Sequence, residues 1–217
     1  MRMNSPFLKK CRQVVLFLPF TTVLPLLPRL EFLKDLRLVL ATGVGIVFHL
    51  LAPYTSSREF LQPSAQDRRS TWFLLLACLV VYYSSLVEAA YGSSLSNPKM
   101  LTVGIALAIL ALGFRSWTTS ILGKLFTATI TLQDDHNIIS EGPYRYLRHP
   151  AYLASIVTLL AVALIFQSWW GVIAFVGLGL PAYLYRIHVE ELALIEKFGD
   201  AYVEKLKHTW RLIPFVY

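Results

Sequence analysis

Long apolar runs, each close to the length of a membrane-spanning helix, constrain this chain more than any other feature of its sequence. Residues 36–54 and 71–91 are the clearest runs, and residues 100–114 form a shorter one. A helix needs about 20 mostly apolar residues to cross the hydrocarbon core of a bilayer. Only 15% of the residues are charged, where a water-soluble protein carries about a quarter. The chain is therefore predicted to be an integral membrane protein.

Two further apolar segments need interpretation. Residues 13–28 are short and interrupted by Pro19 and Pro25, and a basic cluster precedes them. A signal peptide has that form, but no small-x-small cleavage site follows, so an irregular first span is preferred. Residues 151–185 are long enough for two helices, and Ser168-Trp169-Trp170-Gly171 interrupts them near the middle. This pattern predicts a tight hairpin with the two tryptophans at the far interface.

The remaining segments are too polar to cross lipid. Residues 117–132 have the pattern of an interfacial amphipathic helix, and residues 186–217 are charged and helical in pattern up to Pro214. The predicted fold is all-α: a polytopic membrane protein with about six transmembrane helices, an interfacial helix and a C-terminal cytosolic helix. We divide the chain into N-terminal transmembrane helices at 1–114 and a C-terminal region at 115–217.

The basic residues indicate the orientation. With six spans and a cytoplasmic N-terminus, sixteen of the 20 lysines and arginines lie on the cytoplasmic side. The four on the other side are Arg29, Lys34, Arg37 and Lys99. This bias agrees with the positive-inside rule and predicts that both termini face the cytoplasm.

Two classes of function are not indicated by the sequence. The net charge of +7 is distributed along membrane edges and forms no separate basic stripe with interleaved aromatic residues, so no nucleic-acid partner is expected. Cys11 and Cys78 form no CxxC motif, and no HExxH spacing occurs, so no metal site is expected.

Two polar blocks, residues 142–152 and 186–191, should lie at the same membrane face, because only the predicted hairpin separates them. Tyrosines and arginines in these blocks could be interfacial anchors, and the acids could be a solvated helix face. That interpretation does not explain why His149 directly precedes Pro150, which can open a helix. It also does not explain why Arg186 and Glu190 share a helix face one turn apart.

A series of short motifs runs in order through residues 113–214. They are Leu122-Gly123-Lys124, His136-Asn137-Ile138-Ile139, Gly142-Pro143-Tyr144, Arg148-His149-Pro150-x-Tyr152, Glu190-Glu191, Phe198-Gly199-x-x-Tyr202 and Arg211-x-Ile213-Pro214. In order and spacing they resemble the C-terminal region of the isoprenylcysteine carboxyl methyltransferase family, membrane enzymes that use S-adenosylmethionine. The N-terminal spans show no comparable resemblance.

The resemblance implies a role for individual residues. The Arg at position 186 would serve the substrate as the catalytic residue. The cofactor would be bound by His136, Asn137, Ile138, Ile139, Tyr144, His149, Pro150, Ala151, Tyr152 and Glu190. Two positions depart from the family pattern: Ala154, where relatives often have Gly, and Glu141, a position that is commonly small and polar.

These residue types suit methyl transfer to a carboxylate. Glu190 can pair with the ammonium group of S-adenosylmethionine, and the rings of Tyr144 and Tyr152 can face adenine or the sulfonium. A carboxylate acceptor is already a nucleophile near neutral pH and needs no general base. Arg186 would hold it in a two-pronged grip, so that catalysis is mainly alignment and desolvation.

The resemblance also implies the setting of the reaction. The partners would be the lipid bilayer and a lipophilic carboxylate substrate, such as the C-terminal prenylcysteine of a protein or peptide. The active site would face the cytoplasm, at the endoplasmic reticulum in a eukaryote or at the inner membrane in a bacterium.

Three alternatives remain open at the level of the sequence. The acceptor could be another lipid or small molecule with an amine or a thiol. A membrane reductase of the sterol-reductase type, which uses NADPH, has a C-terminal tail similar to residues 198–217. A scaffold or transporter without enzymatic activity would need polar residues along several spans, whereas here they gather at one face.

Overall fold

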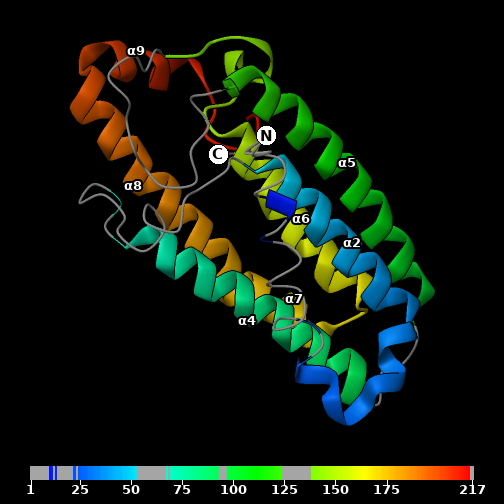
Figure 1. The fold of residues 1–217 in the computed structure, drawn as a ribbon. Coiled ribbons are helices and arrows are strands. Elements are labelled where there is room, and N and C mark those ends of the chain that lie inside the picture. Colours follow the sequence, from blue (N-terminus) through cyan, green and yellow to red (C-terminus); the bar gives the residue numbers. More distant parts are fainter. Residues whose placement is uncertain are drawn as a thin grey trace, which may run out of the picture.

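The computed structural model describes residues 10, 11, 13, 22, 24–52, 67, 69–92, 97–123 and 138–215. All the regular secondary structure in these ranges is helical (Figure 1), as predicted. The helices are η2 (Leu24–Lys34), α2 (Leu36–Leu51), α4 (Ser70–Tyr91), α5 (Pro98–Leu122), η5 (Gly142–Arg145), α6 (Pro150–Ile165), α7 (Trp169–Ala174), η6 (Phe175–Gly179), α8 (Leu180–Phe198) and α9 (Asp200–His208). The segments α7, η6 and α8 follow one another without a gap.

Three helices of the described ranges are long and apolar enough to cross a membrane. They are α4, α5 and the continuous helix Trp169–Phe198. Helices α2 and α6 are apolar but have only 16 residues each. The count of about six spans therefore stays a prediction, and most of its first span, residues 13–28, lies outside the described residues.

Helix α5 is longer than the sequence predicted. The expected span at 100–114 and the first part of the expected interfacial helix at 117–132 are a single helix, Pro98–Leu122. The prediction of a separate helix is thus wrong for residues 117–122, and residues 124–137 lie outside the described part of the chain. Residue 114, after which we divide the chain, lies inside α5, and the division stays a prediction.

The reason for the longer α5 is the environment of Arg115. Its side chain is buried, with 5% of the residue exposed. Nη1 donates to Ser155 Oγ at 2.6 Å, and the guanidinium carbon lies 3.9 Å from the centre of the Phe48 ring. A cation–π contact of this kind stabilises a buried cation. Arg115 therefore does not end the helix at a membrane surface, because its charge is accommodated inside the bundle.

The predicted hairpin is present, with α6 as its first arm and the helix from Trp169 as its second. At the turn, Ser168 Oγ accepts a bond from Gly171 N at 2.8 Å. Glu88 of α4 accepts bonds from Ser168 Oγ and from Trp170 N, the latter at 2.8 Å. Glu88 thus binds α4 to the start of the second arm.

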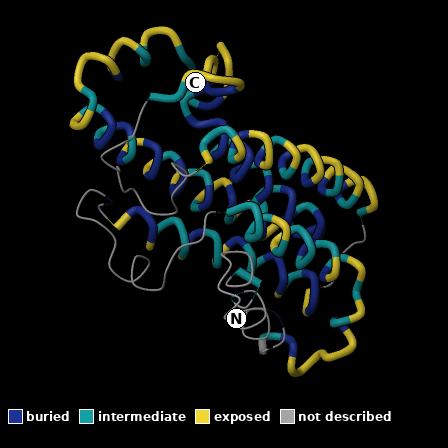
Figure 2. The backbone as a smooth tube through the Cα atoms, turned by 45° about the horizontal axis from the view of Figure 1, so that its top comes forward, coloured by how far each residue is buried: buried dark blue, intermediate teal, exposed yellow. Residues whose placement is uncertain are grey.

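Small residues let α5 and α6 approach closely. Gly104, Ala108 and Ala111 are buried on α5, and Ala154 and Ala161 are buried on α6. A Cβ atom added to Gly104 would lie 2.8 Å from the backbone N of residue 165. Small residues at helix interfaces are typical of membrane bundles. Figure 2 shows the buried residues on the sides of the helices that face one another.

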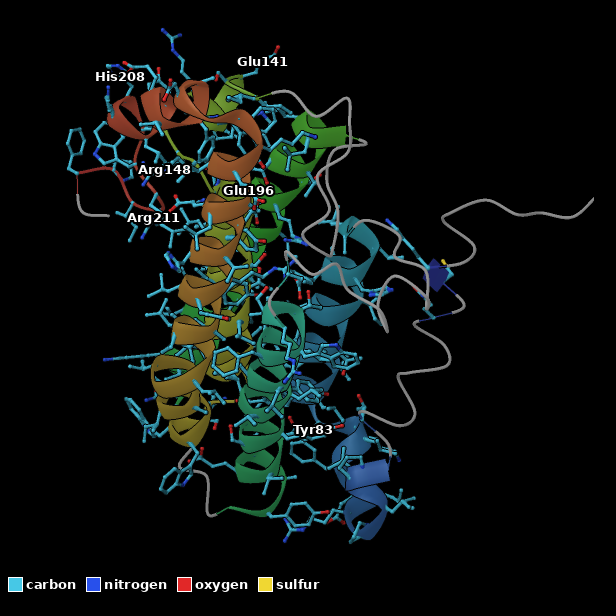
Figure 3. The ribbon with its side chains drawn as sticks, turned by 90° about the vertical axis from the view of Figure 1, so that its left-hand side faces the viewer. Tyr83, Glu141, Arg148, Glu196, His208 and Arg211 are labelled. Atoms are coloured by element: carbon cyan, nitrogen blue, oxygen red, sulfur yellow. The ribbon has the colours of Figure 1, made fainter. Side chains whose placement is uncertain are left out.

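The chain after α9 returns to the segment that precedes α6. Leu147 and Trp210 form a parallel β-bridge. Arg148 N donates to Trp210 O at 2.8 Å, His149 N donates to Arg211 O at 3.1 Å, and Trp210 N donates to Tyr146 O at 3.0 Å. Figure 3 shows Arg148 and Arg211 at the same end of the molecule, away from Tyr83. The segment after α9 therefore lies against the first of the two polar blocks, residues 142–152.

Candidate active site

His149 and Pro150 form the start of α6. His149 is the residue before the helix and Pro150 occupies its first turn, where the missing N–H of proline has no partner to lose. His149 is buried, and its backbone N–H is bonded to the C-terminal segment. The backbone of His149 is thus fixed by the start of α6 on one side and by the C-terminal segment on the other.

Glu191 holds this segment in place. Its Oε1 accepts from Arg148 Nε at 2.9 Å and lies 3.3 Å from His149 Nε2. Its Oε2 lies 2.5 Å from Arg211 Nη2. Only 4% of Glu191 is exposed, so the interpretation of this acid as a solvated helix face is wrong. Charge-assisted bonds from three side chains join α8 to the start of α6 and to the C-terminal segment.

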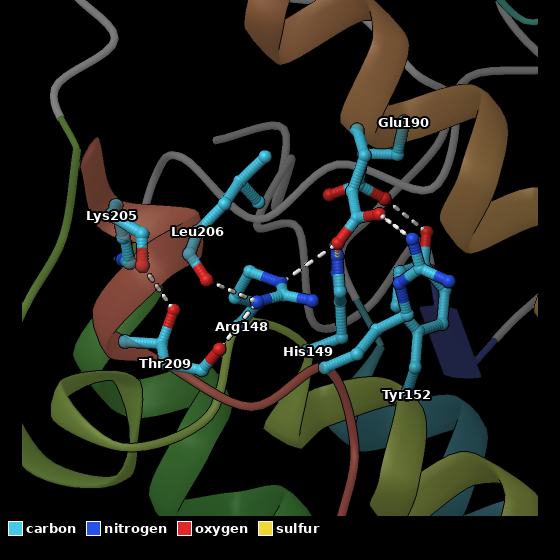
Figure 4. Close-up of polar contacts among 9 residues, drawn as sticks. Arg148, His149, Tyr152, Glu190, Lys205, Leu206 and Thr209 are labelled. Carbon is cyan, nitrogen blue, oxygen red and sulfur yellow. Dashed lines mark hydrogen bonds and ion pairs between the residues drawn. The ribbon is translucent and has the colours of Figure 1, made fainter. Parts of the chain in front are cut away.

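Tyr152 joins the two α8 residues that the sequence placed on one face. Its hydroxyl donates to Glu190 Oε2 at 2.5 Å and accepts from Arg186 Nε at 3.0 Å. Figure 4 shows Tyr152 below Glu190, with His149 beside it. The His149 and Tyr152 ring centres are 5.7 Å apart. Arg186, Tyr152 and Glu190 are thus one hydrogen-bonded chain between α8 and α6.

The other end of the Arg186 guanidinium is bound to the start of α4. Nη1 donates to Asp67 Oδ1 at 3.0 Å, to Ser70 Oγ at 3.0 Å and to Thr71 Oγ1 at 2.7 Å. Asp67 is fully buried. Burial raises its pKa, but bonds from Thr71 and the positive charge of Arg186 act in the opposite direction, and the pKa of the carboxyl lies below its ordinary value. The pair is therefore ionic at neutral pH.

Sequence reasoning missed Asp67. An acid just before the first polar residues of a span is a pattern of helix capping, and Thr71 N does donate to Asp67 Oδ2 at 3.1 Å. That pattern would have placed Asp67 at the helix start. It would not have identified Arg186 as its partner, because 119 residues separate them.

The other predicted cofactor residues lie close by or outside the described chain. Tyr144 is buried, and burial followed by the negative charge of Glu190 raises the pKa of its hydroxyl well above the usual range. Pro150 and Ala151 are buried in the first turn of α6. Ile138 and Ile139 are half-buried. His136 and Asn137 lie outside the described residues.

Lys205 of α9 links the end of the predicted cofactor segment to the C-terminal helix. Its Nζ donates to the backbone oxygen of Ile139. Burial, and then the positive charge of Arg148, lower the pKa of Lys205 to about 8. Figure 4 shows Lys205 on α9, and Arg148 lies beside this helix. Lys205 is the second residue near the site that the sequence did not identify.

Comparison with known proteins shows which family the C-terminal half resembles. The model of the isoprenylcysteine carboxyl methyltransferase family matches residues 104–196, which contain η5, α6 and α8 with the chain Arg186–Tyr152–Glu190. These residues, in the C-terminal half of the protein, are similar to that family. The resemblance drawn from the motifs is confirmed.

Two curated relatives carry the name protein-S-isoprenylcysteine O-methyltransferase. The protein of Dictyostelium discoideum is 27% identical over 144 residues, which are 65% of this chain and 61% of that protein. The protein of Saccharomyces cerevisiae is 25% identical over 203 residues, or 88% of this chain and 84% of that protein. The chain thus spans less than two thirds of the length of the first relative and most of the second.

A solved structure has the same fold. The chain is similar to a eukaryotic intramembrane Ras methyltransferase of the isoprenylcysteine carboxyl methyltransferase family, with a TM-score of 0.56 and 14% identity. The similarity covers 99% of this chain and 70% of the other. The arrangement of helices is therefore similar to that of this solved structure, well beyond the residues that the family model matches.

Proposed function

We propose that this protein moves a methyl group from S-adenosylmethionine to the carboxylate of a lipophilic acceptor, of which the C-terminal prenylcysteine of a protein is the best candidate. The observation that carries the proposal is the chain Arg186–Tyr152–Glu190 within the residues that match the family. Glu190 provides an anion for the cationic methyl donor, and Arg186 provides a cation for the anionic acceptor. The two side chains lie on either side of Tyr152. The names of the two relatives support the acceptor.

The residues at the start of α6 fit S-adenosylmethionine chemically. Glu190 is only partly buried and would pair with the ammonium group. The rings of Tyr144 and Tyr152 and the segment 136–139 would hold the adenosine portion and the sulfonium. When bound, S-adenosylmethionine supplies a methyl group on a cationic sulfur, which a carboxylate oxygen can attack without a general base.

Arg186 would bind the acceptor carboxylate. Its Nε and Nη1 already donate to Tyr152 and to the start of α4. The two-pronged grip expected from the sequence therefore requires the acceptor to displace one of these oxygens. Without displacement, Arg186 attracts the carboxylate through its charge, which the surrounding burial strengthens.

An apolar surface next to Arg186 supports a lipophilic acceptor. On α4, Trp72 directly follows Thr71 and is 38% exposed. On α8, Tyr185 directly precedes Arg186 and is 40% exposed. The Phe73 and Tyr185 rings are in edge contact, with centres 6.0 Å apart. In a bilayer these side chains face lipid, so an acceptor with a prenyl tail would keep the tail in the membrane and bring its carboxylate to Arg186.

Binding and transfer measurements on detergent-purified protein test the proposal. Calorimetry should show binding of S-adenosylmethionine, and binding of NADPH alone would overturn the proposal in favour of a reductase. Glu190→Ala should weaken S-adenosylmethionine binding strongly. Arg186→Ala should preserve that binding and abolish methyl transfer to an S-prenylated N-acetylcysteine. Normal transfer by this variant would show that Arg186 does not bind the acceptor.

A second acceptor class is tested in the same assay. The carboxamide of the prenylated cysteine retains the lipophilic tail but lacks the carboxylate, so it should accept no methyl group. A phospholipid amine and a lipophilic thiol test the alternatives. Transfer to either of these, with none to the carboxylate, would replace the proposed acceptor.

A further inference from the structure

We infer that Asp67, together with Ser70 and Thr71, is a positioning group for Arg186 and thereby for the acceptor carboxylate. The inference rests on the proposed function, because it acts through the binding of the acceptor by Arg186. These three residues lie outside the residues matched by the family model. A segment of the N-terminal part would thus complete a site that otherwise comes from the C-terminal part.

The geometry around Nη1 of Arg186 supports this role. This nitrogen has two hydrogens and three acceptors, Asp67 Oδ1, Ser70 Oγ and Thr71 Oγ1, all within 3.0 Å. Both hydroxyls donate their own hydrogens to Asp67, at 3.1 and 2.8 Å. Their lone pairs are thus available to the guanidinium. With Nε bound to Tyr152, the plane of the guanidinium is held at both ends.

Helix capping occupies only one of the two carboxylate oxygens of Asp67. Capping of α4 uses Oδ2, which accepts from Thr71 N, whereas Oδ1 accepts from Arg186. Asp35 at the start of α2 provides the comparison. It also accepts from a backbone N–H and pairs with an arginine, but that partner is Arg37, two residues away and partly exposed. Asp67 instead binds an arginine of another helix, and both side chains are buried.

The partial charge at the start of α4 also supports this role of Asp67. The N-terminal end of a helix carries a partial positive charge, so an arginine would be repelled from the start of α4 unless an anion lies between them. Asp67 is that anion. Without the charge of Asp67, no anion would attract Arg186 to the start of α4. The bonds of Tyr152 to Arg186 and Glu190 would still be possible. Loss of the Asp67 charge should therefore affect the acceptor more than the methyl donor.

The test is Asp67→Asn in the full-length protein, which retains the size and the capping oxygen but removes the charge. We expect the affinity for S-adenosylmethionine, measured by calorimetry, to change by less than about threefold. We expect kcat/KM for an S-prenylated N-acetylcysteine to fall at least about tenfold, since a misplacement of 1 Å can reduce a rate about 100-fold. Asp35→Asn is the matched control, because it removes a capping, arginine-paired acid near the opposite end of α4 and should leave both quantities unchanged.

A double-mutant cycle separates this inference from the proposed function. If Asp67 acts through Arg186, then Asp67→Asn should reduce kcat/KM much less in an Arg186→Lys background than in the wild type. If Arg186→Lys is impaired and Asp67→Asn has wild-type kinetics, the inference is wrong and the proposed function stands. If Arg186→Lys transfers methyl groups normally, the assignment of Arg186 fails, and the inference fails with it.

A purely structural role of Asp67 would give a different result. In that case Asp67→Asn would lower the thermal unfolding temperature but leave kcat and KM of the folded fraction unchanged, which would overturn the inference. If Asp67→Asn does not fold, Ser70→Ala and Thr71→Val, each of which removes one acceptor of Nη1, take its place. A reduced kcat/KM with unchanged S-adenosylmethionine affinity in these variants supports the inference, and unchanged kinetics overturn it.

Discussion

Two adjacent acids on α8 have different environments. Glu190 is partly buried and bonded to the Tyr152 hydroxyl, whereas Glu191 is buried and bound to Arg148, His149 and Arg211. Neighbouring residues of a helix point about 100° apart. Glu190 therefore faces Tyr152 inside α6, whereas Glu191 faces His149 and Arg148 just before α6 and Arg211 of the C-terminal segment. Their substitution should separate ligand binding from stability.

Glu191→Gln should lower stability strongly. The change leaves the partly buried side chains of Arg148 and Arg211 without a carboxylate. Removing one partner of a fully buried ion pair costs about 3–5 kcal/mol, which is the upper bound here. Thermal unfolding in detergent measures the loss. Glu190→Gln is the control, and it should unfold near the wild-type temperature while binding S-adenosylmethionine more weakly. Equal unfolding temperatures for the two variants would contradict the assigned roles.

Lys205 should make the stability depend on pH. Its folded-state pKa is about 8 against an ordinary value of 10.5, because burial disfavours the charged form. Between these two values the unfolded state binds more protons, so the contribution of Lys205 to the unfolding free energy rises with pH in that window. Below pH 8 the charged lysine opposes folding.

The pH dependence is measured as a difference between variants. Unfolding of wild type and Lys205→Gln is compared from pH 7 to pH 10.5, and the wild type should gain stability relative to the variant as the pH rises. Lys207→Gln is the control, because the Lys207 side chain is 63% exposed. Parallel curves for wild type and Lys205→Gln would show that the lysine is not perturbed.

At the scale of the elements, the hairpin was predictable and the length of α5 was not. Ser168-Trp169-Trp170-Gly171 contains a capping serine and two interfacial tryptophans, all local features that the sequence displays. Arg115 reads as the end of a span because a charge in lipid is expensive. Its burial depends on Ser155 and Phe48, which are distant in the sequence. Local patterns therefore predicted the helix types, and distant partners decided where a helix ends.

Gly104→Ala should separate α5 from α6. The added Cβ would lie 2.8 Å from the backbone N of residue 165 and 3.0 Å from two atoms of Leu164, and backbone atoms cannot move away as a side chain can. Overpacking of this kind costs about 1–3 kcal/mol. Gly113→Ala on the same helix is the control, because its Cβ would meet nothing within 4 Å. A thermal unfolding temperature lowered for Gly104→Ala alone is expected, and the same temperature for both would contradict the close packing.

At the scale of the whole molecule, the candidate site forms where segments far apart in the sequence meet. The start of α4, the start of α6, the middle of α8 and the segment after α9 each contribute a charged side chain to the Arg186 or Glu191 cluster. The sequence predicted that the start of α6 and the middle of α8 meet, because a hairpin joins them. The contributions of Asp67 and of the chain around Trp210 follow from tertiary contacts, which no local pattern reports.

Removal of the C-terminal segment should therefore affect the site as well as the stability. Trp210 O and Arg211 O accept the backbone N–H groups of Arg148 and His149, and Arg211 is one of the three partners of Glu191. A chain that ends at residue 208 loses all of these contacts, so the segment before α6 is released from one side. Because His149 is a predicted S-adenosylmethionine residue, we expect calorimetry to show weaker binding of the donor by the shortened protein. A chain that ends at residue 215 retains the contacts and is the control. If both shortened proteins bind S-adenosylmethionine as the full chain does, the C-terminal segment supports the fold without shaping the site.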